Sequence, residues 1–476
     1  MKKTYKYIFY LSILILSGFF LSGCTVSQEK IDEYNQIVHD ADILVEGKEY
    51  SSAMDKLNSA AQLIPSKYEA YERMVNILIT KNRLEDAKKI IDESASKLSD
   101  SDRSKLYILL GKKYYTEKDY DNALRNYQLA KGISSDTTNV NLETAKVYLQ
   151  LGNIQEAQNI LKGDLGENFN SEGKLIYSYI LSTTNVQSAK DEISNIQPNE
   201  EWKDAYENWK KILDSLTNDD LYNRAKLSKT YIDAGYPYLA ISVLEQKKND
   251  MQEYVDGLYL LGKAYYDNGK YKESIDTLSN VTALSEYNQY IYWILARDYY
   301  MVNNVNEAFS YYDSAISYAG DTGDPKLYQE YLNLLFENNQ NTKAEEVLRK
   351  AESLFKDQWI NLYYMRLAYL NKQDEKVVYY ANKIEYDKLE GNYKVDYLYW
   401  KSKISIENGK LEEAKTTLNL FGDIDKYNPK YNLLMSQLSF QEGKLDDARN
   451  YAKKAIEYDT ERVVTDEAQK LLARID

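Results

Sequence analysis

Two short stretches decide the fold of this chain: Leu110-Gly111-Lys112-Lys113-Tyr114-Tyr115 and Leu261-Gly262-Lys263-Ala264-Tyr265-Tyr266. Each is followed by a polar turn and a second helical stretch, which opens with Asp119-Tyr120-Asp121-Asn122-Ala123 in the first case and Lys270-Tyr271-Lys272-Glu273-Ser274 in the second. Both therefore predict two antiparallel helices joined by a short turn.

The same unit recurs along the chain with a period of about 34 residues. We use one position in the first helix, usually small, as a marker of the unit. The markers are Ala41, Val75, Gly111, Ala145, Ser228, Gly262, Ala296, Leu332, Leu367, Ser402 and Ser436. Five intervals are 34 residues (41–75, 111–145, 228–262, 262–296 and 402–436), and the others are 35 or 36, apart from the gap between 145 and 228.

Two further positions repeat with the marker. Seven residues after it, where the first helix should end, stand Asn82, Gly152, Gly235, Gly269, Asn303, Asn339, Gly409 and Gly443. Gly and Asn tolerate the left-handed conformation that ends a helix, and Lys118 is an exception to the pattern. Twelve residues after the marker, alanine recurs as Ala53, Ala87, Ala123, Ala157, Ala240, Ala308, Ala344, Ala414 and Ala448.

This pattern resembles the tetratricopeptide repeat, a 34-residue unit with small residues at positions 8, 20 and 27, where our marker is position 8. The resemblance implies an all-α fold, a right-handed superhelical solenoid of tandem helical hairpins. One hairpin cannot bury its apolar face alone, so several must stack. The low content of Pro (5) and Gly (19) also favours long helices with short connections.

The repeat register divides the chain. We expect a signal peptide at 1–23, a lipidated cysteine and tether at 24–34, an N-terminal array at 35–162 and a C-terminal array at 221–459. Between the arrays, residues 163–220 read as degenerate hairpins and a possible hinge, with helices near 174–182, 187–196 and 201–216. Residues 320–325 form a loop, and 460–476 form a capping helix.

The N-terminal residues have the pattern of a targeting signal. Lys2, Lys3 and Lys6 precede an apolar run of about fifteen residues, shorter than the roughly 20 of a membrane span. It ends in Leu21-Ser22-Gly23-Cys24, which resembles the lipobox of bacterial lipoproteins. The resemblance implies a diacylglycerol on Cys24, cleavage before it, and a membrane-anchored protein on the extracytoplasmic side. The alternative is a signal anchor with an incidental cysteine.

Composition excludes several kinds of chemistry. The net charge is −14, and loss of the three N-terminal lysines brings it near −14 − 3 = −17, which disfavours nucleic-acid binding. Since Cys24 and His39 are the one cysteine and the one histidine, nucleophile–base pairs and metal sites containing His or Cys cannot be assembled. We predict no catalytic residue, metal or cofactor.

The resemblance also implies a ligand groove lined by positions 2, 5, 9 and 12 of the first helices. Position 9 reads Lys112, Lys146, Lys229, Lys263, Arg297 and Lys403 in six units, and Asp42, Asn76, Asn333, Ala368 and Gln437 in the others. Aromatic candidates at positions 5 and 12 are Tyr259, Trp293, Tyr399, Tyr266 and Tyr300. These residues suggest a groove for an acidic or carboxylate-bearing protein or peptide. Alternatively, the cations only balance acidic residues on the second helices.

Three functions remain open from the sequence. The first is an anchored scaffold for protein–protein interactions in the cell envelope. The second is a glycan-binding surface lipoprotein of the starch-utilisation type, although only five Trp occur and the loops are short. The third is a hydrolase that uses two carboxylates. A further expectation concerns the 48 Tyr against 9 Phe: the hydroxyl should be used at half-buried helix interfaces.

Overall fold

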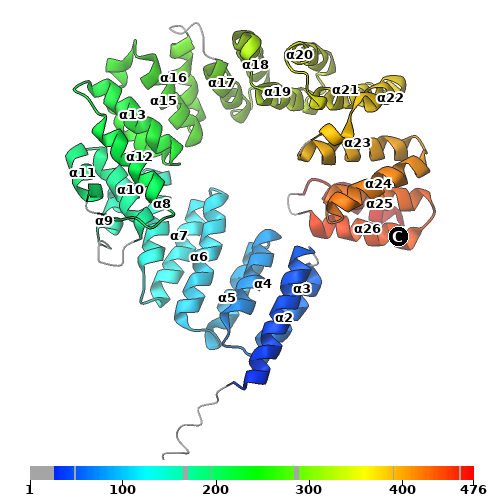
Figure 1. The fold of residues 1–476 in the computed structure, drawn as a ribbon, viewed down its shortest axis with the longest axis horizontal. Helices are drawn as coiled ribbons and strands as arrows, with labels where there is room; N and C mark the ends of the chain where they lie inside the picture. Colours follow the sequence, from blue (N-terminus) through cyan, green and yellow to red (C-terminus); the bar gives the residue numbers. More distant parts are fainter. Residues whose placement is uncertain are drawn as a thin grey trace, which may run out of the picture. The chain divides into compact units, whose positions relative to one another are not determined.

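The computed structural model describes residues 26–47, 50–163, 170–194, 196–282, 289–389, 391–459 and 462–475. Over these ranges the chain is helical and contains no strand (Figure 1). Contacts divide the chain into two compact units, Met1–Ser135 and Asp136–Asp476, called unit 1 and unit 2 below. Within the described part of the chain, no helix is both long and apolar enough to span a membrane. The predicted signal peptide and Cys24 lie outside the described residues.

Unit 1 consists of helical hairpins. Its helices are α2 (Gln28–Glu46) with α3 (Tyr50–Leu63), α4 (Tyr68–Thr80) with α5 (Leu84–Glu93), and α6 (Asp100–Thr116) with α7 (Tyr120–Ile133). A 3-10 turn, η1 (Ser94–Ser96), follows α5.

Unit 2 continues the same alternation of first and second helices. Its hairpins are α8 (Thr138–Leu151) with α9 (Ile154–Gly163), α10 (Ser171–Ser182) with α11 (Val186–Ser194), α13 (Asp220–Asp233) with α14 (Pro237–Leu244), α15 (Val255–Asp267) with α16 (Tyr271–Thr282), α17 (Gln289–Met301) with α18 (Val305–Ala319), α19 (Pro325–Glu337) with α20 (Asn341–Leu354), α21 (Gln358–Leu370) with α22 (Asp374–Lys383), α23 (Asn392–Glu407) with α24 (Leu411–Asp425), and α25 (Pro429–Gln441) with α26 (Leu445–Tyr458). Single helices are α12 (Lys203–Asp214) and α27 (Thr465–Ile475), and the 3-10 turns are η2 (Glu245–Met251), η3 (Gly320–Thr322) and η4 (Tyr386–Lys388). The predicted all-α array of hairpins is confirmed.

The ends of the first helices follow the predicted pattern. All eight Gly and Asn residues predicted there have positive φ. At Asn303 (φ 62°), for example, the following amide, that of Asn304, donates to the carbonyl oxygen of Tyr299 at 2.8 Å, which closes the helix end. Lys118 (φ 61°) and Lys372 (φ 54°) adopt the same conformation although neither is Gly or Asn.

Lys372 corrects the register of one unit. Seven residues before it stands Met365, which is fully buried, so Met365 and not Leu367 is the marker of the α21–α22 hairpin. The sequence-based choice of Leu367 is wrong by two residues, because a lysine at the left-handed position gives no signal to a rule based on Gly and Asn. In the corrected register, position 9 of this hairpin is Arg366 and position 12 is Tyr369.

The recurring alanines have the expected role. All nine are buried with 0% exposure, where they allow the two helices of a hairpin to approach closely. At one marker serine a hydrogen bond crosses the same seam, since the Ser436 hydroxyl donates to the carbonyl oxygen of Ala448 at 2.7 Å. The hydroxyls of the marker serines Ser228 and Ser402 are buried without a hydrogen-bond partner among the described residues.

The irregular segment between the arrays contains one further hairpin and one extra helix. The Ser178 hydroxyl of α10 donates to the carbonyl oxygen of Ala189 in α11 at 3.0 Å, the same contact that Ser436 makes with Ala448 in the α25–α26 hairpin. The Trp209 indole of α12 donates to Ser178 Oγ at 2.8 Å, and its side chain is buried in one core with residues of α8 to α17. The α10–α11 hairpin and the single helix α12 together therefore account for the gap of 228 − 145 = 83 residues between the markers Ala145 and Ser228.

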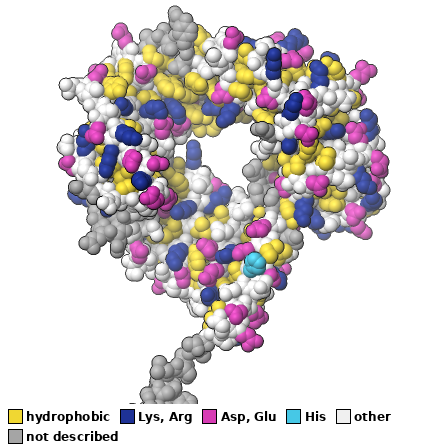
Figure 2. All heavy atoms as spheres, in the orientation of Figure 1, with side chains coloured by type: hydrophobic (Ala, Val, Ile, Leu, Met, Phe, Trp, Pro, Cys, Tyr) yellow, Lys and Arg dark blue, Asp and Glu magenta, His cyan; other side chains and the backbone are white. Residues whose placement is uncertain are grey.

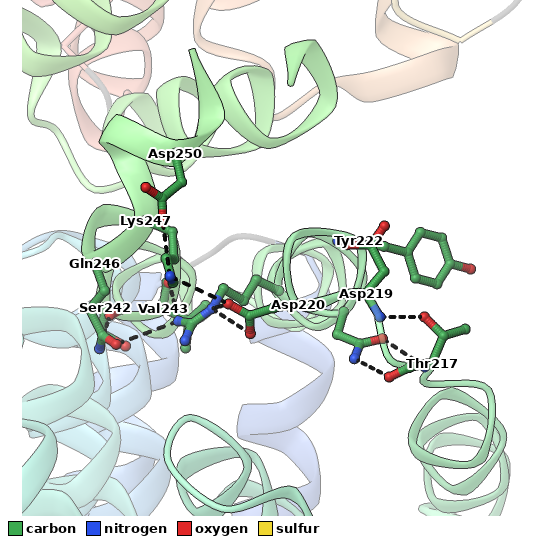
Figure 3. Close-up of polar contacts among 11 residues, drawn as sticks. Thr217, Asp219, Asp220, Tyr222, Ser242, Val243, Gln246, Lys247 and Asp250 are labelled. Atoms are coloured by element: carbon green, nitrogen blue, oxygen red, sulfur yellow. Dashed lines mark hydrogen bonds and ion pairs between the residues drawn. The ribbon is translucent and has the colours of Figure 1, made fainter. Parts of the chain in front are cut away.

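The α13–α14 hairpin shows how its helices are tied together (Figure 3). Arg224 of α13 binds both carboxylate oxygens of Asp220 at 3.0 Å and donates to the carbonyl oxygen of Val243 at 2.7 Å. That carbonyl stands where α14 ends after eight residues and η2 begins. Lys247 pairs with Asp250 at 2.8 Å within η2 and with Asp220 of α13 at 4.0 Å, so a charged contact also joins η2 to α13.

Tyrosine hydroxyls are used at helix interfaces, as expected from the Tyr to Phe ratio. Tyr265 donates to Glu245 at 2.9 Å, and Tyr364 donates to Glu352 at 3.0 Å. The Tyr34 hydroxyl accepts the backbone amide of Ala70 at 3.0 Å, which joins two neighbouring hairpins. Phenylalanine could fill these seams but could not make these hydrogen bonds.

Candidate ligand-binding face

The first helices α15, α17, α19, α21 and α23 of unit 2 present positions 9 and 12 along neighbouring hairpins, and we call this surface the first-helix face. An open pocket of about 540 Å³ lies on it between α15, α17 and α19. Its lining includes Tyr266, Arg297, Tyr300, Met301, Tyr312, Glu330, Asn333, Leu334 and Glu337. Figure 2 shows basic and acidic side chains intermixed on the side of the molecule that it draws.

An arginine–glutamate pair crosses this pocket. Arg297 Nε and Nη2 donate to the two carboxylate oxygens of Glu330 at 2.8 and 2.6 Å, a bidentate arrangement. The Tyr312 hydroxyl donates to the same carboxylate. On its other side, the guanidinium lies 4.2 Å from the ring centroid of Trp293. The predicted groove residues Arg297 and Trp293 therefore stabilise each other, and Trp293 is buried beneath the cation.

The charges of the pair reinforce one another. Burial would raise the pKa of Glu330, but the hydrogen bonds from Arg297 and Tyr312 outweigh burial and lower the pKa below its ordinary value. Burial likewise opposes the charge of Arg297, yet Glu330 raises its pKa. Both groups remain ionised, and Arg297 is already neutralised by the protein itself.

The lysines predicted at position 9 of unit 2 are also paired, with one exception. Their Nζ atoms lie 2.6 Å from carboxylate oxygens: Lys146 from Glu172, Lys229 from Asp233, and Lys263 from Asp267. These acids lie on first helices, not on the second helices that the alternative interpretation requires. The exception is Lys403, whose Nζ lies 5.8 Å from the ring centroid of Tyr399.

The remaining predicted groove residues have separate surroundings. Lys112 is an exposed residue of α6 in unit 1. Tyr300 is 42% exposed and Tyr266 is half-buried, and both line the pocket. Tyr259 is half-buried and packs against the large core of unit 2. Tyr399 is half-buried beside Trp400, with ring centroids 5.2 Å apart.

Arg366 is the residue that the sequence reasoning missed. Its guanidinium lies 4.7 Å from the ring centroid of Phe336 and 5.5 Å from that of Trp400, and its Nη1 donates to Asn333 Oδ1 at 2.9 Å. The two-residue error in the marker assigned position 9 to Ala368, which is buried. No sequence signal available to the Gly and Asn rule could have corrected this error.

An isolated buried acid lies directly after Arg297. Asp298 has 0% exposure, and its Oδ2 lies 2.6 Å from the Ser274 hydroxyl, which lies 2.9 Å from the carbonyl oxygen of Gly262. Burial raises the pKa of Asp298 to about 7, although the contact with Ser274 opposes this. A hydroxyl has one hydrogen, so Ser274 can donate to only one of the two oxygens. A protonated Asp298 resolves the conflict, because it donates to Ser274 and Ser274 donates to Gly262.

Metal coordination has no candidate in the described ranges, where no group of three or more His, Cys, Asp or Glu side chains could hold an ion. His39 is exposed on α2.

Comparison with known proteins identifies the repeat. Residues 255–288 and 429–462 match the family model described as "Tetratricopeptide repeat". The first stretch covers α15 and α16, and the second covers α25 and α26. These two hairpins therefore match the tetratricopeptide repeat, and a left-handed residue ends the first helix of most of the other described hairpins, as it does in these two.

Relatives are similar over part or most of the chain. The TPR repeat-containing protein MJ1428 of Methanocaldococcus jannaschii is 23% identical over 320 residues, which cover 60% of this chain and 53% of that protein, so the match spans about half of the relative. Among solved structures, the APC/C hetero-tetramer Cut9–Hcn1 is 14% identical, with 94% and 96% of the two chains covered and a TM-score of 0.37. Yeast Tom70 is also 14% identical, with coverages of 94% and 95% and a TM-score of 0.37.

Proposed function

We propose that this protein is a scaffold that binds protein partners through the first-helix face of unit 2. The observation that carries the proposal is the open pocket on this face, which combines exposed Tyr300 and Met301 with the fixed charges of Arg297 and Glu330. A concave site with apolar side chains and a few oriented polar groups suits recognition of a partner segment. Because Arg297 and Glu330 neutralise each other, the pocket offers a partner apolar contact and hydrogen bonding more than net charge.

We also propose that the scaffold is tethered by a lipid on Cys24 to the extracytoplasmic side of a bacterial membrane, where it organises envelope proteins. The basic start, the short apolar run and Leu21-Ser22-Gly23-Cys24 support this part of the proposal. The acidic body has little attraction for an anionic membrane surface, so a covalent anchor supplies the attachment.

The tether is tested in a bacterial host that expresses the full chain. Metabolic labelling with an alkyne fatty acid should label the native protein in the membrane fraction, and Cys24→Ala should remove the label. The proposed lipid anchor is contradicted if the Cys24→Ala protein is labelled or if the native protein is not labelled.

The binding function is tested by capture of partners. Residues 25–476 are immobilised and incubated with a detergent extract of the source organism's envelope, beside a variant with Tyr300→Ser and Met301→Ser. The matched control carries Leu420→Ser and Ile424→Ser, because these residues of α24 are comparably exposed, at 47% and 46%, on a second helix.

A defined protein that binds the native and control forms but not the Tyr300 and Met301 variant supports the first-helix face as the site. Equal capture by all three forms removes this face from the proposal. If no form captures a protein, the scaffold function fails and binding to envelope polysaccharides becomes the function to test.

A further inference from the structure

The position 9 cations of unit 2 fall into two classes. Lys146, Lys229, Lys263 and Arg297 each have a carboxylate oxygen at 2.6 Å. Arg366 and Lys403, on the neighbouring first helices α21 and α23, have none within the 4.0 Å of an ion pair among the described residues. The positive charge at position 9 is therefore neutralised in α8, α13, α15 and α17, and in the described residues it has no ion-pair partner in α21 and α23.

Arg366 is oriented by contacts that leave its charge unpaired. Phe336 and Trp400, from the helices on either side, contact the guanidinium, and Asn333 accepts one of its N–H groups. Its buried Nε has no hydrogen-bond partner among the residues that the structure describes, and a guanidinium carries five N–H donors. Aromatic rings and one amide oxygen hold the group in place but do not satisfy it.

Three of the acids whose charges act on Arg366 or Lys403 are held by other groups. Asp396 pairs with Lys430 at 3.6 Å, Glu407 accepts the Tyr369 hydroxyl at 2.6 Å, and Glu467 accepts the Gln437 amide at 2.9 Å. They influence Arg366 or Lys403 only from beyond ion-pair distance.

The electrostatics separate Arg366 from Arg297. Burial lowers the pKa of Arg366, and Tyr363, Asp396 and Glu337 oppose the effect without overcoming it. The pKa of Arg297 is raised, because Glu330 more than offsets burial. A partly desolvated guanidinium with too little compensating charge gains free energy from an added anion.

From this arrangement we infer that Arg366, assisted by Lys403, is the docking point for side-chain carboxylates of an acidic segment in a protein partner. The inference rests on the proposed function and gives its partner a chemistry. Arg366 receives one carboxylate through paired N–H groups, with Phe336 and Trp400 limiting competition from water. Lys403, on the next first helix, receives a second carboxylate further along the segment as a point charge. Two cations on successive helices match consecutive acidic side chains better than a single chain terminus.

The test uses residues 25–476 and a fluorescein-labelled hexaglutamate peptide with an amidated C-terminus, followed by fluorescence anisotropy. Hexaglutamine with the same label shows whether carboxylates are needed, and a free-acid hexaglutamine shows whether a chain terminus suffices. The variants are Arg366→Gln, Arg366→Lys and Lys403→Gln, and Lys229→Gln is the matched control because it removes a position 9 cation that is already paired.

We expect native protein to bind hexaglutamate and neither hexaglutamine. Arg366→Gln should weaken binding at least about tenfold, since a charge-assisted bidentate contact is lost. Arg366→Lys, which keeps the charge but not the paired donors, should show a smaller loss of binding. This graded result would distinguish the loss of a carboxylate contact from misfolding of the Arg366→Gln variant. Lys403→Gln should weaken binding about threefold and Lys229→Gln less than twofold.

Two results with hexaglutamate alone overturn the inference: no binding of it by the native protein, or equal losses of its binding in Arg366→Gln and Lys229→Gln. Binding of free-acid hexaglutamine as tightly as hexaglutamate also overturns it, in favour of a chain terminus. The proposed function fails separately, when the envelope extract yields no partner. A partner captured equally well by Arg366→Gln leaves the scaffold standing and removes only the acidic docking point.

Discussion

The hairpins α17–α18 and α21–α22 each have an arginine at position 9, but the two arginines have different contacts. Arg297 and Arg366 are 366 − 297 = 69 residues apart, and the left-handed residues Asn303 and Lys372 share this offset. Arg297 meets Glu330 in a bidentate pair, whereas Arg366 meets an asparagine and two aromatic rings. The same backbone unit therefore yields a closed charge pair in one place and an open cation in the other.

The difference comes from the first helices on either side of each arginine. The residue that Arg297 contacts in α19 is Glu330, while the residues that Arg366 contacts in α23 and α19 are Trp400 and Asn333. A repeat makes the scaffold uniform, and single substitutions on neighbouring first helices make its surface specific. The following predictions test this contrast, in order of decreasing effect.

The largest expected effect is a pH dependence of stability that is confined to the α17–α18 hairpin and its neighbours. Asp298 has Leu367 as its counterpart 69 residues later, so only the α17 seam contains a buried acid at this place. Its pKa of about 7 in the folded state lies above its unfolded value, so folding takes up a proton, and stability is lost as the pH rises from about 4 to 7. Above pH 7 the loss is complete, on the order of 4 kcal/mol at most.

Asp298→Asn should remove this dependence, because the amide can donate to Ser274 as the protonated acid does. Hydrogen exchange of peptides from α15–α17 at pH 5 and pH 8 measures the change, with peptides from α21–α23 as the internal reference. An unchanged difference between the two pH values in Asp298→Asn would show that another group is responsible.

The second largest effect on stability should follow removal of the Arg297–Glu330 ion pair. Arg297→Met leaves the Glu330 carboxylate with the Tyr312 hydroxyl as its remaining described donor, and we expect a destabilisation of about 2 kcal/mol, reduced from a buried pair because both side chains are about one third exposed. Urea unfolding, monitored by hydrogen exchange of peptides from α17–α19, measures this destabilisation. The double variant Arg297→Met with Glu330→Gln should recover much of the loss, and failure to recover would mean that packing on Trp293 matters more than charge.

A smaller effect is expected at the left-handed residues. Lys372→Gly should stabilise the α21–α22 hairpin by about 1 kcal/mol, because glycine adopts positive φ without the cost that a side chain carries. Asn303→Gly should gain only a few tenths, since asparagine tolerates this conformation. Equal gains in the two thermal unfolding midpoints would contradict this ranking.

The smallest effect on stability should come from replacing Arg366, the cation without an ion-pair partner among the described residues. Arg366→Met removes an unpaired, partly desolvated charge and keeps an apolar side chain between Phe336 and Trp400, so stability should change by less than about 0.5 kcal/mol. Asn333 retains the Tyr363 hydroxyl as a donor at 3.3 Å. A loss as large as that of Arg297→Met would show that Arg366 is a structural residue.

The sequence predicted most of the fold and part of the candidate site. Eight helix ends and nine buried alanines follow from local rules, because positive φ favours Gly or Asn and a close helix pair leaves room only for a small side chain. Lys118 and Lys372 escaped those rules, since packing of the hairpin imposes the conformation there against the preference of the residue. The error at Lys372 then hid Arg366.

By itself the sequence determined the repeat, its period and the residues available to the first-helix face, because these depend on neighbours a few positions apart and on periodic burial. Only the tertiary structure decided which cations are neutralised. Arg297 is balanced by a glutamate 33 residues further along the chain, and whether such residues meet depends on side-chain direction and on the register of the next hairpin. The long-range pairing separates Arg297, held in a closed pair, from Arg366, left open to a partner.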